Sequence, residues 1–500
     1  MSILGLDIGT TGTKSIVFDE DGNQLATSYE EYSNVFPEPG WVEFDVELMW
    51  EKVFSTIKAV NADPDVKKDP VEALSVSTIG ESFTPVDKAG NTLYNTIYST
   101  DARSVKELEL VYEKISPRDL FEINGYPASY ICPLNKIIWI KNNRPDIYKK
   151  THKLLFTQDL LYHRLGIEET MIDYSLCSRT LFFDIRDKTW SKDILEKFDI
   201  DIGLFSKPVQ AGTLVGTVSK KISSELGFTK KVSVVAGLHD QPAAAFGVGA
   251  IEDGIAADGM GTVECVTVAM KDLILNDDMY KYNFSVQAYA LKDMYVTLGF
   301  NFTSGSSLKW YRDTLASHEK EIAESKGIDV YDSFFKDLDF KPSGLLVLPY
   351  FTASGTPYID PRPKASIIGM SLSTTKKDIF KAIVEGLAFE IKFITELMQD
   401  SGVNIKELRA VGGGSKSDYW LKLKSSVMDK PIKKMKINEA GCLATMMLAG
   451  HGIGKFGLKE AVEKFVKVEK AFEPQKDIYK RYLDSFNRYT KLYPSIKDLV

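Results

Sequence analysis

The chain has 500 residues, of which 44% are hydrophobic and 26% are charged, and its formal net charge is −7. This length exceeds what one hydrophobic core supports, so we expect two large domains. The negative charge argues against a nucleic-acid-binding surface, no apolar stretch is long enough to span a membrane, and the cysteines and histidines lack metal-site spacing. The N-terminal segment lacks the pattern of a signal peptide, so we expect a cytoplasmic protein.

The first motif follows a predicted strand at residues 3–6. It combines an acidic residue, a glycine- and threonine-rich turn and a lysine, namely Asp7, Thr10, Thr11, Gly12, Thr13 and Lys14. Residues 15–18 are again strand-like, so the turn joins two strands, whereas a P-loop opens a helix. The N–H and hydroxyl groups of such a turn suit phosphate oxygens, and a carboxylate beside them suits a hydrated divalent cation. The motif therefore predicts either a metal–nucleotide site or an ordinary hairpin turn.

The candidate catalytic acid follows a predicted buried strand at residues 232–237. Asp240 stands there with Pro242, just before a helical run of alanines. A carboxylate at the end of a parallel strand can accept the proton of an attacking hydroxyl during phosphoryl transfer. The same pattern also fits a helix N-cap.

Near residue 258 the opening pattern returns. A strand-like segment leads through Asp258 to Gly261 and Thr262, and a second strand follows from Cys265. Two such hairpins half a chain apart indicate duplicated domains that face each other across a cleft. We expect both turns to bind the phosphates of one nucleotide.

A third glycine cluster follows the strand-like residues 408–411. It consists of Gly412, Gly413 and Gly414, and Ser417 precedes a helical pattern that begins at Asp418. Glycines let the backbone approach a planar ring or a sugar closely. We interpret the segment as a ligand-facing loop, with a flexible strand–helix connection as the alternative.

Together these motifs resemble the FGGY family of carbohydrate kinases, which is related to actin and Hsp70. The resemblance covers nearly the whole chain, including residues 133–143 and 369–390. It implies an α/β protein with two ribonuclease-H-like (actin-like ATPase) domains, at residues 1–246 and 247–500, flanking a catalytic cleft. It also implies ATP and Mg²⁺ as cofactors and a small sugar as substrate.

The resemblance assigns a role to each motif. Asp240 matches the general base, and with Asp7 it is a candidate metal ligand. The remaining cofactor-binding positions are Thr10, Thr11, Gly12, Thr13 and Lys14 in the first phosphate motif, Gly261 and Thr262 in the second, and Gly413, Gly414 and Ser417 in the adenosine region.

The sugar-binding tract matches the family less closely. Gly80 and Glu81 stand where glycerol kinases carry an arginine–glutamate pair and xylulose kinases a methionine–histidine pair. Asp101 and Arg103 match the next tract, in which Ser99 replaces a common tryptophan. The smaller side chain leaves a roomier pocket, which argues against the smallest polyol. We predict that Gly80, Glu81, Asp101, Arg103 and Asp240 bind the sugar; the alternative for Asp101 and Arg103 is an ion pair within the domain.

These features favour a carbohydrate kinase with a ketopentose such as xylulose as substrate. Alternatives are a polyol, a 6-deoxyketohexose such as fuculose or rhamnulose, a sugar acid such as gluconate, or an Hsp70- or actin-like nucleotide switch. An aromatic stripe near the C-terminus indicates an amphipathic helix. That helix serves either internal packing or a homodimer interface.

Overall fold

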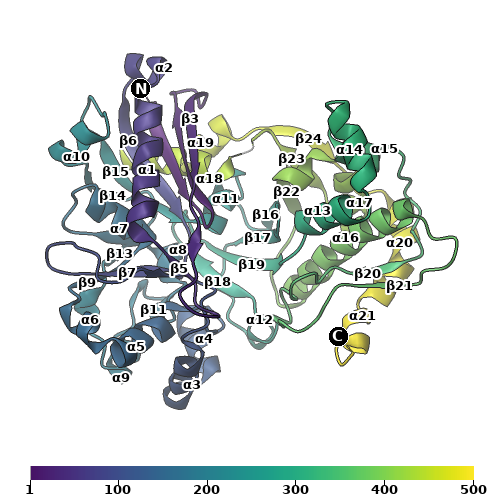
Figure 1. The fold of residues 1–500 in the computed structure, drawn as a ribbon, viewed down its shortest axis with the longest axis horizontal. Helices are drawn as coiled ribbons and strands as arrows, with labels where there is room; N and C mark the ends of the chain where they lie inside the picture. Colours follow the sequence, from purple (N-terminus) through teal and green to yellow (C-terminus); the bar gives the residue numbers. More distant parts are fainter. Residues whose placement is uncertain (1, 438, 500) are drawn as a thin grey trace.

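The computed structural model describes residues 2–437 and 439–499, which form two α/β lobes that lie side by side (Figure 1). Each lobe has one mixed β-sheet at its centre, and the N-terminal lobe has a second, five-stranded sheet beside it. The N-terminal sheet has, in spatial order, strands β14 (Leu214–Thr217), β15 (Ser233–His239), β6 (Val71–Thr78), β1 (Ser2–Ile8), β2 (Gly12–Phe18) and β3 (Gln24–Glu31). The C-terminal sheet has strands β18 (Ser285–Ala288), β19 (Tyr295–Asn301), β17 (Glu264–Met270), β16 (Ile255–Met260), β22 (Glu407–Val411), β23 (Ile432–Met435) and β24 (Val468–Phe472).

The two sheets share one topology. In the first, β1, β2 and β3 form an antiparallel meander, and β6 and β15 then run parallel to β1. In the second, β16, β17 and β19 form the meander, and β22 and β23 run parallel to β16. This repetition confirms the predicted α/β fold with two actin-like domains. The predicted boundary between residues 246 and 247 falls in the last turn of helix α11 (Asp240–Gly247).

Helices cover both faces of each sheet. α1 (Val46–Asn61), capped by Asp45, packs on β2 and β3, and α16 (Lys376–Asp400) and α17 (Asp418–Met428) pack together on the outer side of the C-terminal lobe. Between the sheets lie α11 and α18 (Ala440–Gly452), which contact each other. Although α18 comes from the C-terminal half of the sequence, it packs on β1, β6 and β15 of the N-terminal sheet (Figure 1).

Apolar residues from both sheets and from α11 and α18 form one shared hydrophobic core. Glycines bring the backbones together there. A Cβ atom at Gly5 would lie 2.3 Å from the carbonyl oxygen of Cys442, and one at Gly247 would lie 1.9 Å from that of Ala440. The two lobes are therefore joined by a tightly packed pair of helices, where a hinge for domain closure would have to be.

The predicted C-terminal helix is α20 (Lys476–Tyr489), and its aromatic stripe packs inside the C-terminal lobe. The hydroxyl groups of Tyr482 and Tyr489 donate to Glu385 and Glu390, two buried carboxylates of α16. The stripe therefore serves internal packing, and a homodimer stays a prediction. Among the described residues, no helix is both long and apolar enough to cross a membrane.

Candidate active site

The first phosphate motif is the tip of the β1–β2 hairpin, as its sequence predicts. Thr10 and Thr11 lie in the turn, which is closed by a 2.9 Å hydrogen bond from the N–H of Gly9 to the carbonyl oxygen of Gly12. Tyr32 stabilises the turn, because its hydroxyl donates a hydrogen bond to the carbonyl oxygen of Gly9 at 2.5 Å. The two threonines lie at the surface of the turn, where their N–H and hydroxyl groups can donate hydrogen bonds to phosphate oxygens.

Thr13 corrects one of the predicted contacts. Asp7 and Lys14 are cross-strand partners and share one face of the sheet, whereas Thr13 faces the other side, against α1, and is completely buried. Successive side chains of a strand alternate between faces. The side chain of Thr13 therefore points away from Asp7 and Lys14 and is not available for the predicted phosphate contact.

Asp7 lies at the end of β1 with its side chain partly exposed. Burial and the negative charges of Asp240 and Glu439 raise its pKa to about 6, against the opposing effects of a hydrogen bond from Ser77 and the charge of Lys14. Two carboxylates that lie close enough to repel each other fit a cation between them. No group of three or more metal-ligating side chains occurs among the described residues. This donor set still suits Mg²⁺, which is commonly held by one or two carboxylates and by substrate phosphates.

Asp240 is the first residue of α11, directly after β15, and its side chain is 32% exposed. The N-cap of this helix is His239, so the alternative interpretation of Asp240 as an N-cap is wrong. His239 instead joins Asp240 to the other lobe. Its Nε2 lies 3.2 Å from Oδ1 of Asp240, and its Nδ1 lies 3.1 Å from Oε1 of Gln287 on β18.

The second phosphate motif has a turn like that of the first, but it has no acidic side chain at the position equivalent to Asp7. In the first hairpin, Asp7 and Lys14 form the second cross-strand pair from the turn, and in the second hairpin this position is taken by Gly259 and Cys265. Asp258 comes one residue earlier and therefore points to the opposite face, since a shift of one residue exchanges the faces of a strand. There it binds Lys424 of α17, which also binds Glu264.

The second turn itself is exposed and held by the start of helix α13 (Gly305–Thr314). The carbonyl oxygen of Thr262 accepts hydrogen bonds from the N–H groups of Ser304 and Ser306, and that of Gly261 accepts one from Gly305. The N–H of Gly261 closes the turn by donating to the carbonyl oxygen of Val263 at 3.0 Å. The phosphate contact of Gly261 and Thr262 stays a prediction.

The third glycine cluster lies against β16. A Cβ atom at Gly412 would approach the carbonyl oxygen of Met260 to 2.8 Å, and one at Gly414 would approach the ring of Trp420 to 2.7 Å, whereas one at Gly413 would meet no atom within 4 Å. Gly413 thus faces open space, as a ligand-facing residue should. Ser417 caps α17 by accepting a hydrogen bond from the N–H of Trp420.

The sugar tract follows β6. Glu81 has a left-handed backbone (φ 54°), which is uncommon for residues other than glycine, and its side chain is buried. Nε of Arg179 donates to Oε1 of Glu81 at 2.5 Å, and Nη2 donates to the hydroxyl of Tyr126 at 2.7 Å. Arg179, His239 and Lys136 hold the pKa of Glu81 below its ordinary value although burial opposes them. Glu81 is therefore an anion with a fixed cationic partner.

Asp101 and Arg103 are brought together as a buried ion pair. The Arg103 side chain is fully buried, binds Asp101 and Glu43, and stacks on Trp41 with its Cζ 3.9 Å from the ring centre. Asp101 also accepts a hydrogen bond from the N–H of Val42. These contacts favour the alternative of an ion pair within the domain, and a sugar contact by the two side chains stays a prediction. Their charges are satisfied within the N-terminal domain.

Comparison with known proteins identifies the family. Models of the N-terminal and C-terminal domains of the FGGY family of carbohydrate kinases match residues 2–247 and 259–453. The chain belongs to the FGGY family. It is therefore an ATP-dependent carbohydrate kinase, as the motifs predict.

Relatives within the family carry different names. A xylulose kinase of Staphylococcus epidermidis is 27% identical over 99% of this chain and 97% of its own length. A glycerol kinase of Bacillus mycoides is 28% identical over 94% of both chains. Among solved structures, a "xyloylose kinase" from Brucella ovis superposes with a TM-score of 0.88 at 25% identity, covering 100% of both chains. A ligand-bound xylulose kinase from Lactobacillus acidophilus shares the fold, with a TM-score of 0.89 at 21% identity over 99% of this chain and 98% of its own.

Three residues of this FGGY kinase site were not predicted from the sequence. Arg179 and Gln287 come from segments without a local signature, and only their contacts place them at the site. His239 could have been singled out because it immediately precedes Asp240. Side chains of the other lobe also reach this region, since Ser285 on β18 contacts Arg179 and Gln287 contacts His239.

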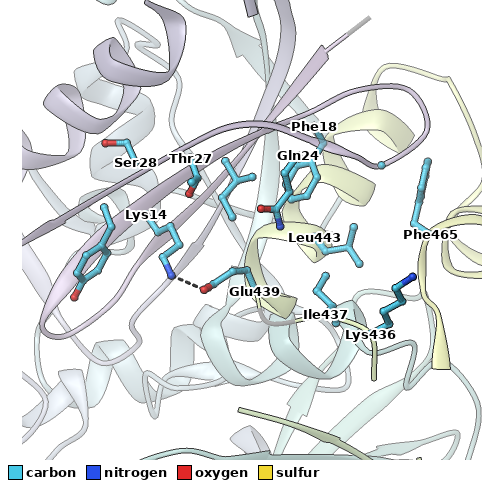
Figure 2. Close-up of a pocket in the computed structure, with 13 residues that line it drawn as sticks. Lys14, Phe18, Gln24, Thr27, Ser28, Lys436, Ile437, Glu439, Leu443 and Phe465 are labelled. Carbon is cyan, nitrogen blue, oxygen red and sulfur yellow. Dashed lines mark hydrogen bonds and ion pairs between the residues drawn. The ribbon is translucent and has the colours of Figure 1, made fainter. Parts of the chain in front are cut away.

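Beside the first phosphate turn lies a cavity of about 540 Å³, between the β2–β3 hairpin and the segment leading into α18 (Figure 2). At one end of it, Nζ of Lys14 lies 2.5 Å from Oε1 of Glu439, the N-cap residue of α18. Lys14 is thus held by a carboxylate from the C-terminal half of the chain. Phosphates that bind Lys14 must compete with Glu439.

Proposed function

We propose that this kinase transfers the γ-phosphoryl group of ATP to a hydroxyl group of a ketopentose such as xylulose. The observation that carries the proposal is the position of Asp240, a partly exposed carboxylate at the end of β15, with Asp7 on one side and the Glu81–Arg179 pair nearby. The small Ser99 in place of a tryptophan and the xylulose kinases among the relatives support a sugar longer than glycerol.

In the proposed mechanism, Asp240 accepts the proton of the attacking hydroxyl, and His239 holds the carboxylate in place through its 3.2 Å contact. Glu81 and Arg179 orient the sugar. Lys14 and the turns around Thr11 and Thr262 bind the phosphates from both lobes. Most of the catalytic effect in phosphoryl transfer comes from such positioning and charge stabilisation.

Asp7 and Asp240 would hold Mg²⁺ together with the phosphates. When bound, the ion neutralises charge on the transferred group. The hinge formed by α11 and α18 would let the lobes close on both ligands, which excludes water and limits hydrolysis of ATP.

The test measures ADP release from ATP with a panel of ketopentoses, 6-deoxyketohexoses, polyols including glycerol, and sugar acids. We expect the highest kcat/KM with a ketopentose. Asp240→Asn keeps the shape of the side chain but removes the base, so kcat should fall at least about a hundredfold while ATP still binds. Equal turnover with and without every sugar, or near-normal turnover of the Asn variant, would contradict the proposal.

Glycerol is the second candidate substrate, because Glu81 matches the glutamate of the glycerol kinase pair. A kcat/KM for glycerol above that for every ketopentose would establish it instead.

A further inference from the structure

Gly80 has no side chain, but the space beside it is filled. A Cβ atom at position 80 would lie 3.1 Å from Cδ2 and Nε2 of His239 and 3.6 Å from Cγ of Arg179. Two side chains from distant parts of the sequence therefore occupy the place into which a side chain at position 80 would extend. Both are polar, and both adjoin a residue of the proposed mechanism, Asp240 or Glu81.

One N–H group of the Arg179 guanidinium makes no hydrogen bond among the contacts of the described residues. A guanidinium group has five N–H donors. Four are used within the described part of the chain: two on Glu81, one on Tyr126 and one, at 3.4 Å, on Oγ of Ser285. The group also stacks on Tyr126, with its Cζ 4.0 Å from the ring centre. It is thus a fixed, planar donor next to an acceptor carboxylate.

The C-terminal lobe holds both side chains from the opposite side. Ser285 and Gln287 lie two residues apart on β18 and therefore on the same face of that strand. Ser285 contacts Arg179, and Gln287 contacts Nδ1 of His239. Strand β18 is also anchored to the N-terminal lobe by a hydrogen bond of 2.6 Å from the N–H of Val286 to the carbonyl oxygen of Gly125.

We propose that Arg179 and His239 together replace the side chain that position 80 lacks. Arg179 is the specificity-determining residue: its free N–H donates to a substrate oxygen adjacent to the one held by Glu81. His239 is a positioning residue that acts through Asp240. This inference rests on the proposed function.

The charges of this arrangement select the class of substrate. Glu81 already pairs with Arg179. A carboxylate on the substrate would therefore have to compete with Glu81 for the guanidinium, whereas neighbouring hydroxyl or keto oxygens match one acceptor and one donor. The site takes a neutral polyhydroxy substrate and disfavours sugar acids.

Arg179→Lys and Arg179→Met test the donor, with Arg186→Met as control, since Arg186 is exposed and bonds only to the carbonyl oxygen of Glu122 among the described side-chain contacts. For the preferred neutral sugar, kcat/KM should fall about 10- to 100-fold in both variants, while KM for ATP stays within about twofold. The Lys variant keeps a charge but not the planar fork, so its loss separates geometry from charge.

Folding is checked independently by ATP binding and thermal unfolding. Because Arg179→Met leaves Glu81 without its partner, Glu81→Gln combined with Arg179→Met serves as the variant without an unpaired buried charge. This double variant should fold and have a lower sugar kcat/KM than Glu81→Gln alone. If the two values lie within about twofold of each other, Arg179 does not contact the sugar.

His239 is tested by a double-mutant cycle with position 80. Gly80→Ala should impair the wild-type enzyme because of the 3.1 Å contact but be tolerated in a His239→Ala background. His239→Ala should lower kcat more than it changes KM for the sugar, and His239→Asn should restore part of kcat by supplying a donor to Asp240. Equal costs of Gly80→Ala in both backgrounds would overturn the inference.

The outcomes separate this inference from the proposed function. If the wild-type enzyme phosphorylates no neutral sugar, the proposed function fails. If it does so and the Arg179 variants are unaffected, only the present inference fails. If gluconate is its best substrate, both fail.

Discussion

Lys424 offers a sharp test of how the C-terminal domain is held together. Its Nζ lies between the carboxylates of Asp258 and Glu264, and none of the three side chains is more than 1% exposed. Glu264 also accepts a hydrogen bond of 2.7 Å from Ser304, beside the second phosphate turn. Lys424→Met keeps an unbranched side chain of similar length but leaves two buried carboxylates without a cation.

Removing one partner of a buried ion pair costs about 3–5 kcal/mol. For a domain of 150–250 residues, about 2–4 °C is lost per kcal/mol, so the unfolding temperature should fall by about 6–20 °C near pH 8. Lys422→Met is the matched control on the same helix, since Lys422 lies over the ring of Phe340 at 5.0 Å. Its unfolding temperature should change by at most a few degrees.

The loss should depend on pH in a defined direction. Burial raises the pKa of Glu264 from 4.5 to about 7 even with Lys424 present, and without Lys424 it rises further. A carboxyl whose pKa is higher in the folded state stabilises that state at low pH, and this stabilisation is lost as the pH rises from about 4.5 through the folded-state pKa. Each such carboxyl contributes about 1.4 kcal/mol per pH unit over that range.

The variant should therefore be closest to the wild type near pH 5 and furthest from it near pH 8. Scanning calorimetry of both proteins at the two pH values measures this. An unfolding temperature within about 2 °C of the wild type at pH 8, well below the shift expected for about 3 kcal/mol, would refute the role of Lys424.

Three further predictions concern the nucleotide side and the hinge. In separate calorimetric titrations, Asp7→Ala should weaken Mg²⁺-dependent ATP binding far more than sugar binding. Because the pKa of Asp7 is raised to about 6, Mg²⁺-dependent ATP binding by the wild type should also weaken as the pH falls through that value. Glu439→Gln should release Lys14 from its 2.5 Å ion pair and strengthen ATP binding, and unchanged affinity would show that Lys14 does not bind phosphate. Gly5→Ala should destabilise the protein by about 1–3 kcal/mol, as overpacking does, because its Cβ would lie 2.3 Å from the carbonyl oxygen of Cys442. Urea unfolding measures this loss. Gly413→Ala is the control, since a Cβ there meets no atom within 4 Å.

The sequence by itself determined the features that short segments encode. The hairpin at residues 2–18, the strand–turn–strand around Gly261 and the helix from Asp418 all depend on local alternation, turn residues and caps, so they could be predicted. The recurrence of one such pattern also predicted two equivalent domains, and the strand order of the two sheets confirms them.

Only the tertiary structure decided which charges meet. A register difference of one residue turned Asp258 away from the cleft, although its sequence resembles that around Asp7. Arg103 was a candidate ligand in the sequence, yet packing against Trp41 buried it with Asp101. Conversely, Arg179 reached Glu81 from 98 residues away. Local patterns specify turns and faces, but the partners of a buried charge depend on how distant elements pack. This packing alone brought Arg179, His239 and Gln287 together beside Glu81 and Asp240.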